Sequence, residues 1–555
     1  MRKFGKAFAA LSAALLATGV LAACGSDDSD SGGGGGAGKT GGELKVAYSS
    51  QPDFLDPALS YTVDGWAAMW NVYLPPMGYK HEEGSTGSEL APMLAEDLPK
   101  VSEGGKVYSF TFKKGIKFSD GTPLKASDFE HTVKRVLNLE SGGAFYYEKI
   151  EGTDEFAKAK DPAKADISGI ETNDETGEVT VTLSEPDGTF PAILGLNFSG
   201  VVPSSTPFKN QTSTPPPGTG AYKITSSEPN REFVLEKNTE FKPFEGVPEG
   251  KADKLTFEII KSLSRAAQDT IRGRIDAMHD PPPADLQPTI ESKYKDRYKS
   301  FTTQSTYYFF LNEKIAPFDD VKAREAVNVG IDKPALARLF GGGLFAPGCN
   351  FLPPGIPGYA KVDPCPWGDP NGKPDLEKAK ALLEESDYNG ETITVWGNSE
   401  DPTQKVTEAY AEMLKEIGFK AEPKIIDGGV YFATVGNEKT KAQTGFDNWF
   451  ADFPSPANYM FLVNGKSIQP TNSQNHGNVD DPELTSKISE LEQNPDPSSV
   501  ADEWAAADKT VIDGAHGAPY GQRKLTAFTS ERVDFENCAL VHPLYQVDYG
   551  SLCLK

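Results

Sequence analysis

The chain has 555 residues and a formal net charge of −25 at pH 7, with 38% hydrophobic and 24% charged residues. This length exceeds what one hydrophobic core usually holds, so we expect several domains. The acidic balance argues against nucleic acid as a partner, because phosphates are bound by Lys and Arg.

Residues 1–23 have the layout of a secretory signal, in which three basic residues precede an apolar, Ala-rich run over 8–21. That run is too short for a transmembrane helix, and no later segment is long and apolar enough to span a bilayer. Its end, Leu-Ala-Ala followed by Cys24, resembles the bacterial lipobox, whose cysteine is lipidated and becomes the mature N-terminus. The alternative is an ordinary signal peptide with an unused thiol nearby.

The segment after Cys24 favours a tether. Residues 24–42 are rich in Gly, Ser and Asp and contain no apolar residue larger than Ala, a composition typical of a flexible linker. Alternating apolar residues at 44–48 predict the first strand, so the folded body should begin near Glu43. Removing residues 1–23, which carry three positive charges, changes the formal charge from −25 to −28. We expect the protein at the cell membrane, lipid-anchored on its extracytoplasmic face.

Strand and helix periodicities alternate along the folded body. Period-two alternation predicts strands over 108–112 and 179–183, and a capping box at Ser127 predicts the start of a helix. The other predicted elements are a helix capped by Asp332 and ended by glycines 341–343, a helix over 376–383, a strand over 392–396 and a helix over 410–417 ended by Gly418. This alternation favours α/β lobes.

The four remaining cysteines form two pairs that are local in sequence, Cys349 with Cys365 and Cys538 with Cys553. An exported protein meets an oxidising environment, so disulfides within these two pairs are expected. The alternative is a metal site. It is disfavoured because neither pair has Cys-x-x-Cys spacing, and only the second has a histidine, His542, close by.

Motifs of known catalytic chemistry are missing from the sequence. It contains no Gly-x-Ser-x-Gly elbow and no His-Glu-x-x-His. The six histidines lack metal-ligand spacing, and 80 acidic residues make any pair of carboxylates uninformative. We therefore expect no enzyme, no cofactor and no metal, and an exported enzyme is an alternative without a specific signal.

Several short blocks of sequence occur in order along the chain, at 90–96, 108–112, 117–129, 218–222, 317–326 and 330–333. Together they resemble the bacterial extracellular solute-binding proteins of family 5, the peptide- and nickel-binding components of ABC importers. The resemblance extends from about residue 43 to the C-terminus. Most of these blocks consist of turns and helix caps, so they identify a scaffold and do not name its ligand.

The resemblance implies a periplasmic-binding-protein-like, two-lobe α/β fold of type II with an extra inserted domain and a ligand cleft between the lobes. The implied boundaries are 43–86, 200–304 and 526–555 for lobe I, 87–199 for the inserted domain and 305–525 for lobe II. It also implies that the lobes close around the ligand, and that the loaded form delivers it to an ABC permease driven by a separate ATPase. We expect a monomer.

The resemblance also points to a ligand-binding residue in the segment 449–456, Trp-Phe-Ala-Asp-Phe-Pro-Ser-Pro. In peptide-binding members, a similar Trp-x-Ala-Asp block supplies an aspartate that pairs with the α-ammonium group of the peptide. Asp452 stands at that place, preceded by Trp449. The alternative is that Asp452 caps a turn before Pro454 and that Trp449 belongs to the core.

Further candidates for the cleft are Ser60, Tyr61, Thr62, Phe145, Tyr146 and His279. The first three lie where family members place an extended segment that hydrogen-bonds the peptide backbone. The next two are adjacent aromatic residues, for which core packing is the alternative. The histidine lies where some relatives carry an aromatic contact, with a structural role as the alternative.

The expected function is that of a lipid-anchored receptor of an ABC importer, with oligopeptides as the favoured ligand. The alternatives on the same scaffold are nickel held by a chelator, an oligosaccharide, or a signalling peptide that is sensed and not imported. The scaffold blocks do not distinguish between these ligands.

Overall fold

The computed structural model describes residues 38–84, 86–494 and 496–555. The predicted signal peptide, the lipidation candidate Cys24 and residues 24–37 of the predicted linker lie outside the described residues. Within the described part of the chain, no helix has the length and apolar character that crossing a membrane requires.

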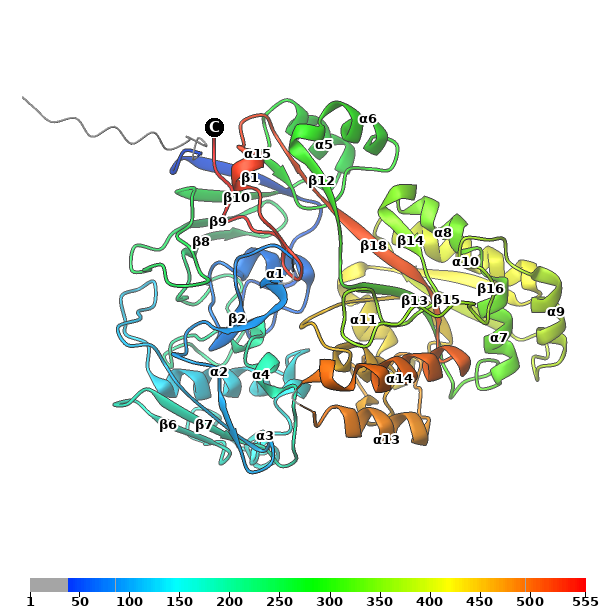
Figure 1. Cartoon of the computed structure of the whole chain (residues 1–555), viewed down its shortest axis with the longest axis horizontal. Helices are drawn as coiled ribbons and strands as arrows, with labels where there is room; N and C mark the ends of the chain where they lie inside the picture. The colour runs from blue at the N-terminus through cyan, green and yellow to red at the C-terminus, as the bar shows by residue number, and fades with distance from the viewer. Residues whose placement is uncertain (1–37, 85, 495) are drawn as a thin grey trace, which may run out of the picture. The chain divides into compact units, whose positions relative to one another are not determined.

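A large mixed sheet extends through both halves of the structure (Figure 1). Its strands follow one another in the order β16 (Lys420–Ile426), β15 (Thr392–Asn398), β17 (Thr444–Phe450), β13 (Ser305–Leu311), β18 (Ala518–Thr529), β11 (Ala277–Met278), β1 (Glu43–Tyr48), β10 (Lys254–Ile259), β9 (Glu232–Lys237) and β8 (Tyr222–Glu228). We call the part around β1 and β8 to β11 lobe I, and the part around β13 and β15 to β17 lobe II.

The long strand β18 connects the two lobes, as Figure 1 shows in red. Its first residues pair with β13 of lobe II, and its last residues pair with β11 and with β12 (Tyr298–Thr302) of lobe I. The short strand β14 (Phe345–Pro347) pairs with the middle of β18. The predicted boundary between lobe II and the last segment of lobe I, at 525/526, therefore falls inside one continuous strand.

Each lobe buries its own aromatic core. In lobe I, Tyr48 of β1 meets Phe233 and Phe257 edge to face, with ring centroids 5.7 and 5.3 Å apart. In lobe II, Phe309 of β13 stacks on Tyr410 at 3.6 Å. Such pairs stabilise a core beyond the burial of their area, because the ring quadrupoles attract in these geometries.

The inserted domain is built around a separate antiparallel sheet, β4 (Lys100–Ser102), β5 (Val107–Thr111), β7 (Glu178–Thr182) and β6 (Ile170–Asn173). The predicted alternation is confirmed, since Tyr108 lies opposite Val181 and both side chains are buried. The helix α2 (Ala126–Asn138) begins one residue before Ser127, so the predicted cap position is wrong. The Ser127 hydroxyl donates instead to Asp174 at 3.1 Å, and Asp128 accepts the Lys125 N–H at 2.9 Å.

The remaining helices are α1 (Val63–Met69), α3 (Thr153–Ala157), α4 (Phe190–Ile193), α5 (Leu263–Ile271), α6 (Gln287–Lys293), α7 (Val321–Gly330), α8 (Lys333–Leu339), α9 (Leu376–Glu384), α10 (Thr403–Ile417), α11 (Gly428–Val435), α12 (Ala457–Met460), α13 (Pro482–Leu491), α14 (Ala501–Asp513) and α15 (Phe535–Cys538). Short hairpins join β2 (Met77–Tyr79) to β3 (Leu90–Pro92) and β19 (Val541–His542) to β20 (Gln546–Val547). Two other predicted helix boundaries are confirmed: Asp332 accepts the Ala335 N–H before α8, and Gly418 ends α10.

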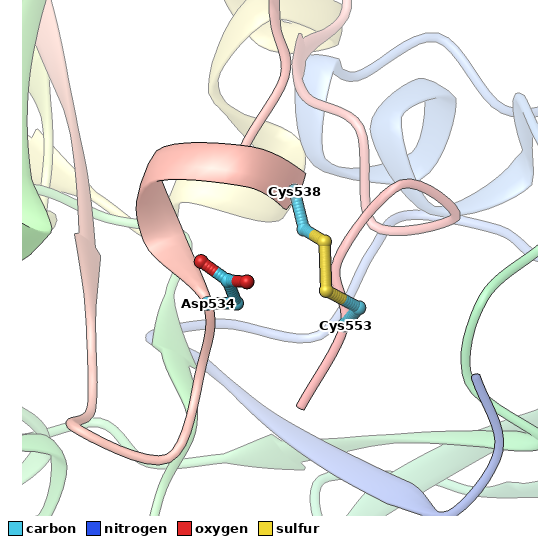
Figure 2. Close-up of side chains that lie close together, drawn as sticks. All are labelled: Asp534, Cys538 and Cys553. Carbon is cyan, nitrogen blue, oxygen red and sulfur yellow. A yellow bond between two sulfur atoms is a disulfide. The ribbon is translucent and has the colours of Figure 1, made fainter. Parts of the chain in front are cut away.

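Both predicted disulfides are present, between Cys349 and Cys365 and between Cys538 and Cys553. Figure 2 shows the second one, with the Asp534 carboxylate beside its sulfur atoms. Thiolates bind metal ions, whereas these sulfurs are bonded to each other. The geometry therefore favours the disulfide over the alternative of a metal site at this pair.

Residues 38–42, assigned to the linker from their composition, lie against the C-terminal segment. The Lys39 N–H donates to the Leu554 carbonyl at 2.9 Å, and the Gly42 N–H donates to Asp253 at 2.8 Å. Residues 38–42 thus belong to the packed body, although its start was predicted near Glu43. Composition could not show this, because backbone groups of a distant segment hold these residues.

Candidate ligand-binding site

Asp452 lies in the short connection between β17 and α12 in lobe II. The strand ends at Phe450, and two prolines, Pro454 and Pro456, prevent it from continuing before α12 begins at Ala457. This places Asp452 at the end of a central strand of lobe II, and 7% of its surface is exposed.

One oxygen of the Asp452 carboxylate, Oδ2, accepts three hydrogen bonds. The Tyr146 hydroxyl donates at 2.5 Å, the Tyr61 hydroxyl at 3.0 Å and the Asn458 amide at 3.1 Å. The Asp452 N–H in turn donates to the Asn458 side-chain oxygen at 2.8 Å. Among the described residues, none donates a hydrogen bond to the other oxygen, Oδ1.

The charge on Asp452 has no cationic partner in the described part of the chain. Burial raises the pKa of Asp452 to about 6, and the hydrogen bonds from Tyr146, Asn458 and Tyr61 offset part of this effect. A buried carboxylate that carries its charge without a cation is costly, and such groups concentrate at functional sites. The arrangement is suited to a cationic group supplied from outside.

Aromatic rings from segments far apart in the sequence enclose this carboxylate. Tyr61 meets Trp449 edge to face at 6.0 Å, and Trp449 meets Phe461 in the same way at 5.0 Å. Phe145 lies against Tyr146 at 4.1 Å and stacks on Phe461 at 5.5 Å. Ring faces of this kind attract ammonium groups through their quadrupole and exclude water.

These contacts bear on the turn-cap alternative for Asp452. A turn-capping aspartate accepts backbone N–H groups of its own turn. Within the described residues, the Asp452 carboxylate accepts its hydrogen bonds from side chains, two of which belong to the distant Tyr61 and Tyr146. Trp449 is half-buried, and its indole N–H donates to Asn458 at 3.2 Å. The geometry differs from that of a turn cap, and the role of Asp452 toward a ligand stays a prediction.

Of the three predicted residues near the start of α1, only Tyr61 reaches Asp452. The hydroxyls of Ser60 and Thr62 both donate to Asp53 at 2.8 Å, and the Tyr61 N–H donates to the same carboxylate at 2.6 Å. Asp53 thus fixes the backbone that carries Tyr61. A backbone role of this segment toward a ligand stays a prediction.

His279 belongs to a separate cluster in lobe I. Its Nε2 lies 2.8 Å from Asp64, its Nδ1 lies 2.7 Å from the Tyr549 hydroxyl, and its ring stacks on Tyr48 at 4.2 Å. Burial lowers the pKa of His279, but the Asp64 charge outweighs it and raises the pKa overall. Both ring nitrogens have partners inside lobe I, which supports the structural alternative for this residue.

Asn458 was not predicted from the sequence, although it contacts three of the predicted residues. It bonds Asp452 twice, accepts from Trp449 and donates to the Tyr146 hydroxyl at 3.0 Å. Its position in the first turn of α12, six residues after Asp452, was the signal available. A helix that begins just after a strand end directs its first side chains back to that strand end.

The chain is similar in sequence to one family of known proteins and to several of its members. The model of bacterial extracellular solute-binding proteins, family 5 Middle, matches residues 89–470. The periplasmic oligopeptide-binding protein OppA of Escherichia coli K12 is 27% identical over 486 residues, which cover 82% of this chain and 84% of OppA. The dipeptide-binding protein DppE of Bacillus subtilis 168 is 25% identical over 458 residues, which cover 79% of each chain.

The solved structures agree on the fold. Clavulanic acid biosynthesis oligopeptide binding protein 2 superposes with a TM-score of 0.82 at 24% identity, covering 93% of this chain and 96% of that one. At this identity the likeness establishes the fold alone. It confirms the predicted two-lobe fold of periplasmic-binding-protein type.

Proposed function

Since the chain belongs to the bacterial extracellular solute-binding proteins of family 5, we propose that it is a peptide receptor of an ABC importer that binds the peptide's α-ammonium group at Asp452. Proteins of this family bind solutes for import and are not enzymes. Two relatives are named for oligopeptides and dipeptides. The observation that carries the proposal is the buried Asp452 carboxylate, which has no cationic partner among the described residues.

The two oxygens of Asp452 suit two different tasks. Oδ2 is held by Tyr61, Tyr146 and Asn458, which fixes the orientation of the carboxylate. Oδ1 is then directed to receive the ammonium group in a charge-assisted hydrogen bond. Because the orientation is already fixed, little conformational entropy is lost when the peptide binds.

Access to Asp452 requires the lobes to separate. Tyr61 follows β1 of lobe I and Tyr146 belongs to the inserted domain, whereas Asp452 belongs to lobe II. With these contacts formed, the carboxylate is buried, so a peptide reaches it only after they open and is enclosed when the lobes close. The closed, loaded form then delivers the peptide to the permease, and a separate ATPase supplies the energy.

A free α-ammonium group should be required for binding. We expect N-acetylation of a bound peptide to weaken its affinity at least 30-fold, because a buried charge pair of this type contributes about 2–5 kcal/mol. Isothermal titration of matched free and acetylated peptides measures the difference. If acetylated peptides bind as well, or if only a sugar or a metal chelate raises the melting temperature, the peptide proposal is wrong.

Affinity for peptides should depend on pH in a bell-shaped way. The pKa of Asp452 is about 6 in the free protein, and a bound ammonium lowers it, so affinity is full above pH 6. Below that pH the carboxyl group takes up a proton, and affinity falls by up to about tenfold per pH unit. Above about pH 8 the peptide amine loses its own proton, and affinity falls again.

A control variant tests whether the loss of affinity below pH 6 comes from Asp452 or from another buried carboxyl group. Burial raises the pKa of Glu492 to about 7, and Glu492 lies 4.0 Å from Lys149 of the inserted domain. We expect the peptide affinity of Glu492→Gln still to fall below about pH 6. The affinity of Asp452→Asn should not change in this pH range. If affinity no longer falls at low pH in Glu492→Gln, the group that titrates is Glu492 and not Asp452.

We also propose that a lipid on Cys24 anchors the receptor to the membrane. The support is the lipobox-like sequence, since Cys24 lies outside the described residues. A Cys24→Ala chain should bind peptide with unchanged affinity, incorporate no labelled fatty acid and appear in the soluble fraction. An anchor raises the effective concentration of the receptor near its permease, so peptide uptake should also fall. Labelled fatty acid in the variant would contradict the assignment.

A further inference from the structure

A groove on lobe I has no role in the proposed peptide site. It has a volume of about 820 Å³ and lies beside α5 and the start of β1. Four basic side chains line it, Lys45, Arg265, Arg272 and Arg274. The groove therefore has more basic than acidic side chains in a chain whose net charge is −25.

Two acidic side chains also line the groove. Glu258 pairs with Lys45 at 2.9 Å, and 29% of its side chain is exposed. Asp269 pairs with Arg265 at 3.5 Å and with Arg274, and only 9% of its side chain is exposed. The two arginine side chains are 72% and 60% exposed. Arg272 is exposed and forms no ion pair within the described part of the chain. The surface that solvent meets is therefore mainly guanidinium.

The groove lies close to the point where the N-terminal tether meets the body. Lys45 follows Lys39 by six residues, a path of at most about 20 Å along the chain. Lys39 pairs with Leu554 of the C-terminal segment, whose last residue donates its N–H to the Arg532 carbonyl at 2.9 Å. Figure 1 shows α5, β1 and the C-terminus at the same end of lobe I.

Arg532 extends the basic surface from the groove toward residues 38–42, where the predicted tether joins the body. Its Nη1 pairs with Asp276 at 3.1 Å, and the same carboxylate accepts the Lys45 N–H at 2.9 Å. Asp276 is fully buried, whereas 45% of the Arg532 side chain is exposed. In this pair the outward-facing charge is positive.

We propose that this basic groove is a docking surface for the phosphate headgroups of anionic phospholipids. Planar guanidinium groups bind phosphate oxygens in pairs, which suits an arginine-lined groove. An anionic membrane repels most of this acidic protein, so the basic groove beside the tether decides which face of lobe I approaches the lipid. The proposal concerns a different surface from the peptide site and does not depend on the ligand at Asp452.

Binding to vesicles tests the proposal without a lipid anchor. The probe protein is the chain from residue 24 onward carrying Cys24→Ala, which retains the described body and its tether. We expect it to co-sediment with vesicles of about 30% phosphatidylglycerol in phosphatidylcholine at about 50 mM salt, and not with phosphatidylcholine alone. Raising the salt to about 500 mM should release it, because the contact is electrostatic.

A double variant assigns this binding to the groove. Arg265→Gln with Arg272→Gln removes two exposed cations and leaves Arg274 on Asp269. Each basic residue at an anionic lipid surface contributes about fivefold in partitioning, so we expect about a 25-fold loss. The control is Lys405→Gln with Lys415→Gln on α10, which removes two exposed cations, each paired with a carboxylate, away from the groove. The control should bind the vesicles like the parent chain.

Each remaining outcome would overturn the proposal. These are equal binding to both kinds of vesicle, an equal loss in the control, or unchanged binding by the double variant. Displacement by about 10 mM inorganic phosphate at constant ionic strength would indicate a site for soluble anions instead. If the double variant fails to fold, judged by its melting temperature, Arg272→Gln alone should still lower partitioning about fivefold.

Discussion

Replacing Asp452 with Asn should abolish tight peptide binding. The expected loss is about 2–5 kcal/mol, which is roughly 30-fold to several thousand-fold in Kd. Asn has the same shape, and its oxygen can still accept the hydroxyls of Tyr61 and Tyr146. The variant therefore removes the charge and keeps the aromatic enclosure. Isothermal titration with a free-amine peptide at pH 7 measures the loss.

The stability of the Asp452→Asn protein distinguishes lost binding from lost folding. Without peptide its melting temperature should equal or exceed that of the parent chain, because the change removes a buried charge that lacks a cationic partner. With peptide, the rise in melting temperature seen for the parent chain should vanish. Asp502→Asn, the same change at an exposed position in the first turn of α14, is the matched control. A Kd within threefold of the parent value would remove the role assigned to Asp452.

Local elements of this fold were predictable because their causes are local. The alternation at 44–48 and the stop at Gly418 lie within the residues that form β1 and α10. Asp452 and Trp449 were found through a short block of sequence. That Tyr61 and Tyr146 meet the same carboxylate was not predictable, because 391 and 306 residues separate them from Asp452. Folding alone brings these segments together.

Contacts with distant residues also account for what the sequence did not show. The Ser127 cap was wrong because Asp174, in another segment, takes the serine hydroxyl. The hydroxyls of Ser60 and Thr62 donate hydrogen bonds to the Asp53 carboxylate in the same loop. The sequence alone does not show that this carboxylate takes them. Polar side chains are directed by whichever partner the fold places nearby, so residue type alone indicates a donor and not its acceptor.

The buried ion pair between Asp56 and Arg135 should dominate the stability of the region that carries the two tyrosines. Both side chains are fully buried, and the guanidinium binds the carboxylate with two hydrogen bonds of 3.0 and 2.7 Å. Arg135→Met leaves the Asp56 charge buried and unpaired, which should cost about 3–5 kcal/mol. Unfolding in urea, followed by tryptophan fluorescence, measures the change.

A double-mutant cycle separates the pair from its surroundings. Asp56 also accepts the N–H groups of Ala58 and Gln211, and Asn can retain part of these bonds. Asp56→Asn with Arg135→Met should therefore lose less stability than the two single variants together, by about 0.5–3 kcal/mol. Lys405→Met, which removes an exposed pair with Asp401, is the control and should cost about 0.5 kcal/mol. Strict additivity would show that the two charges do not stabilise each other.

The same pair links stability to binding. Asp56 lies five residues before Tyr61, and Arg135 is on α2, eleven residues before Tyr146. Their bond ties together the two segments that hold Oδ2 of Asp452, so its loss should also disturb the peptide site. At urea concentrations where Arg135→Met is still folded, we expect peptide affinity to fall severalfold, since a displaced hydrogen-bond donor weakens a preorganised site. Unchanged affinity in that range would show that the tyrosines are positioned without the ion pair.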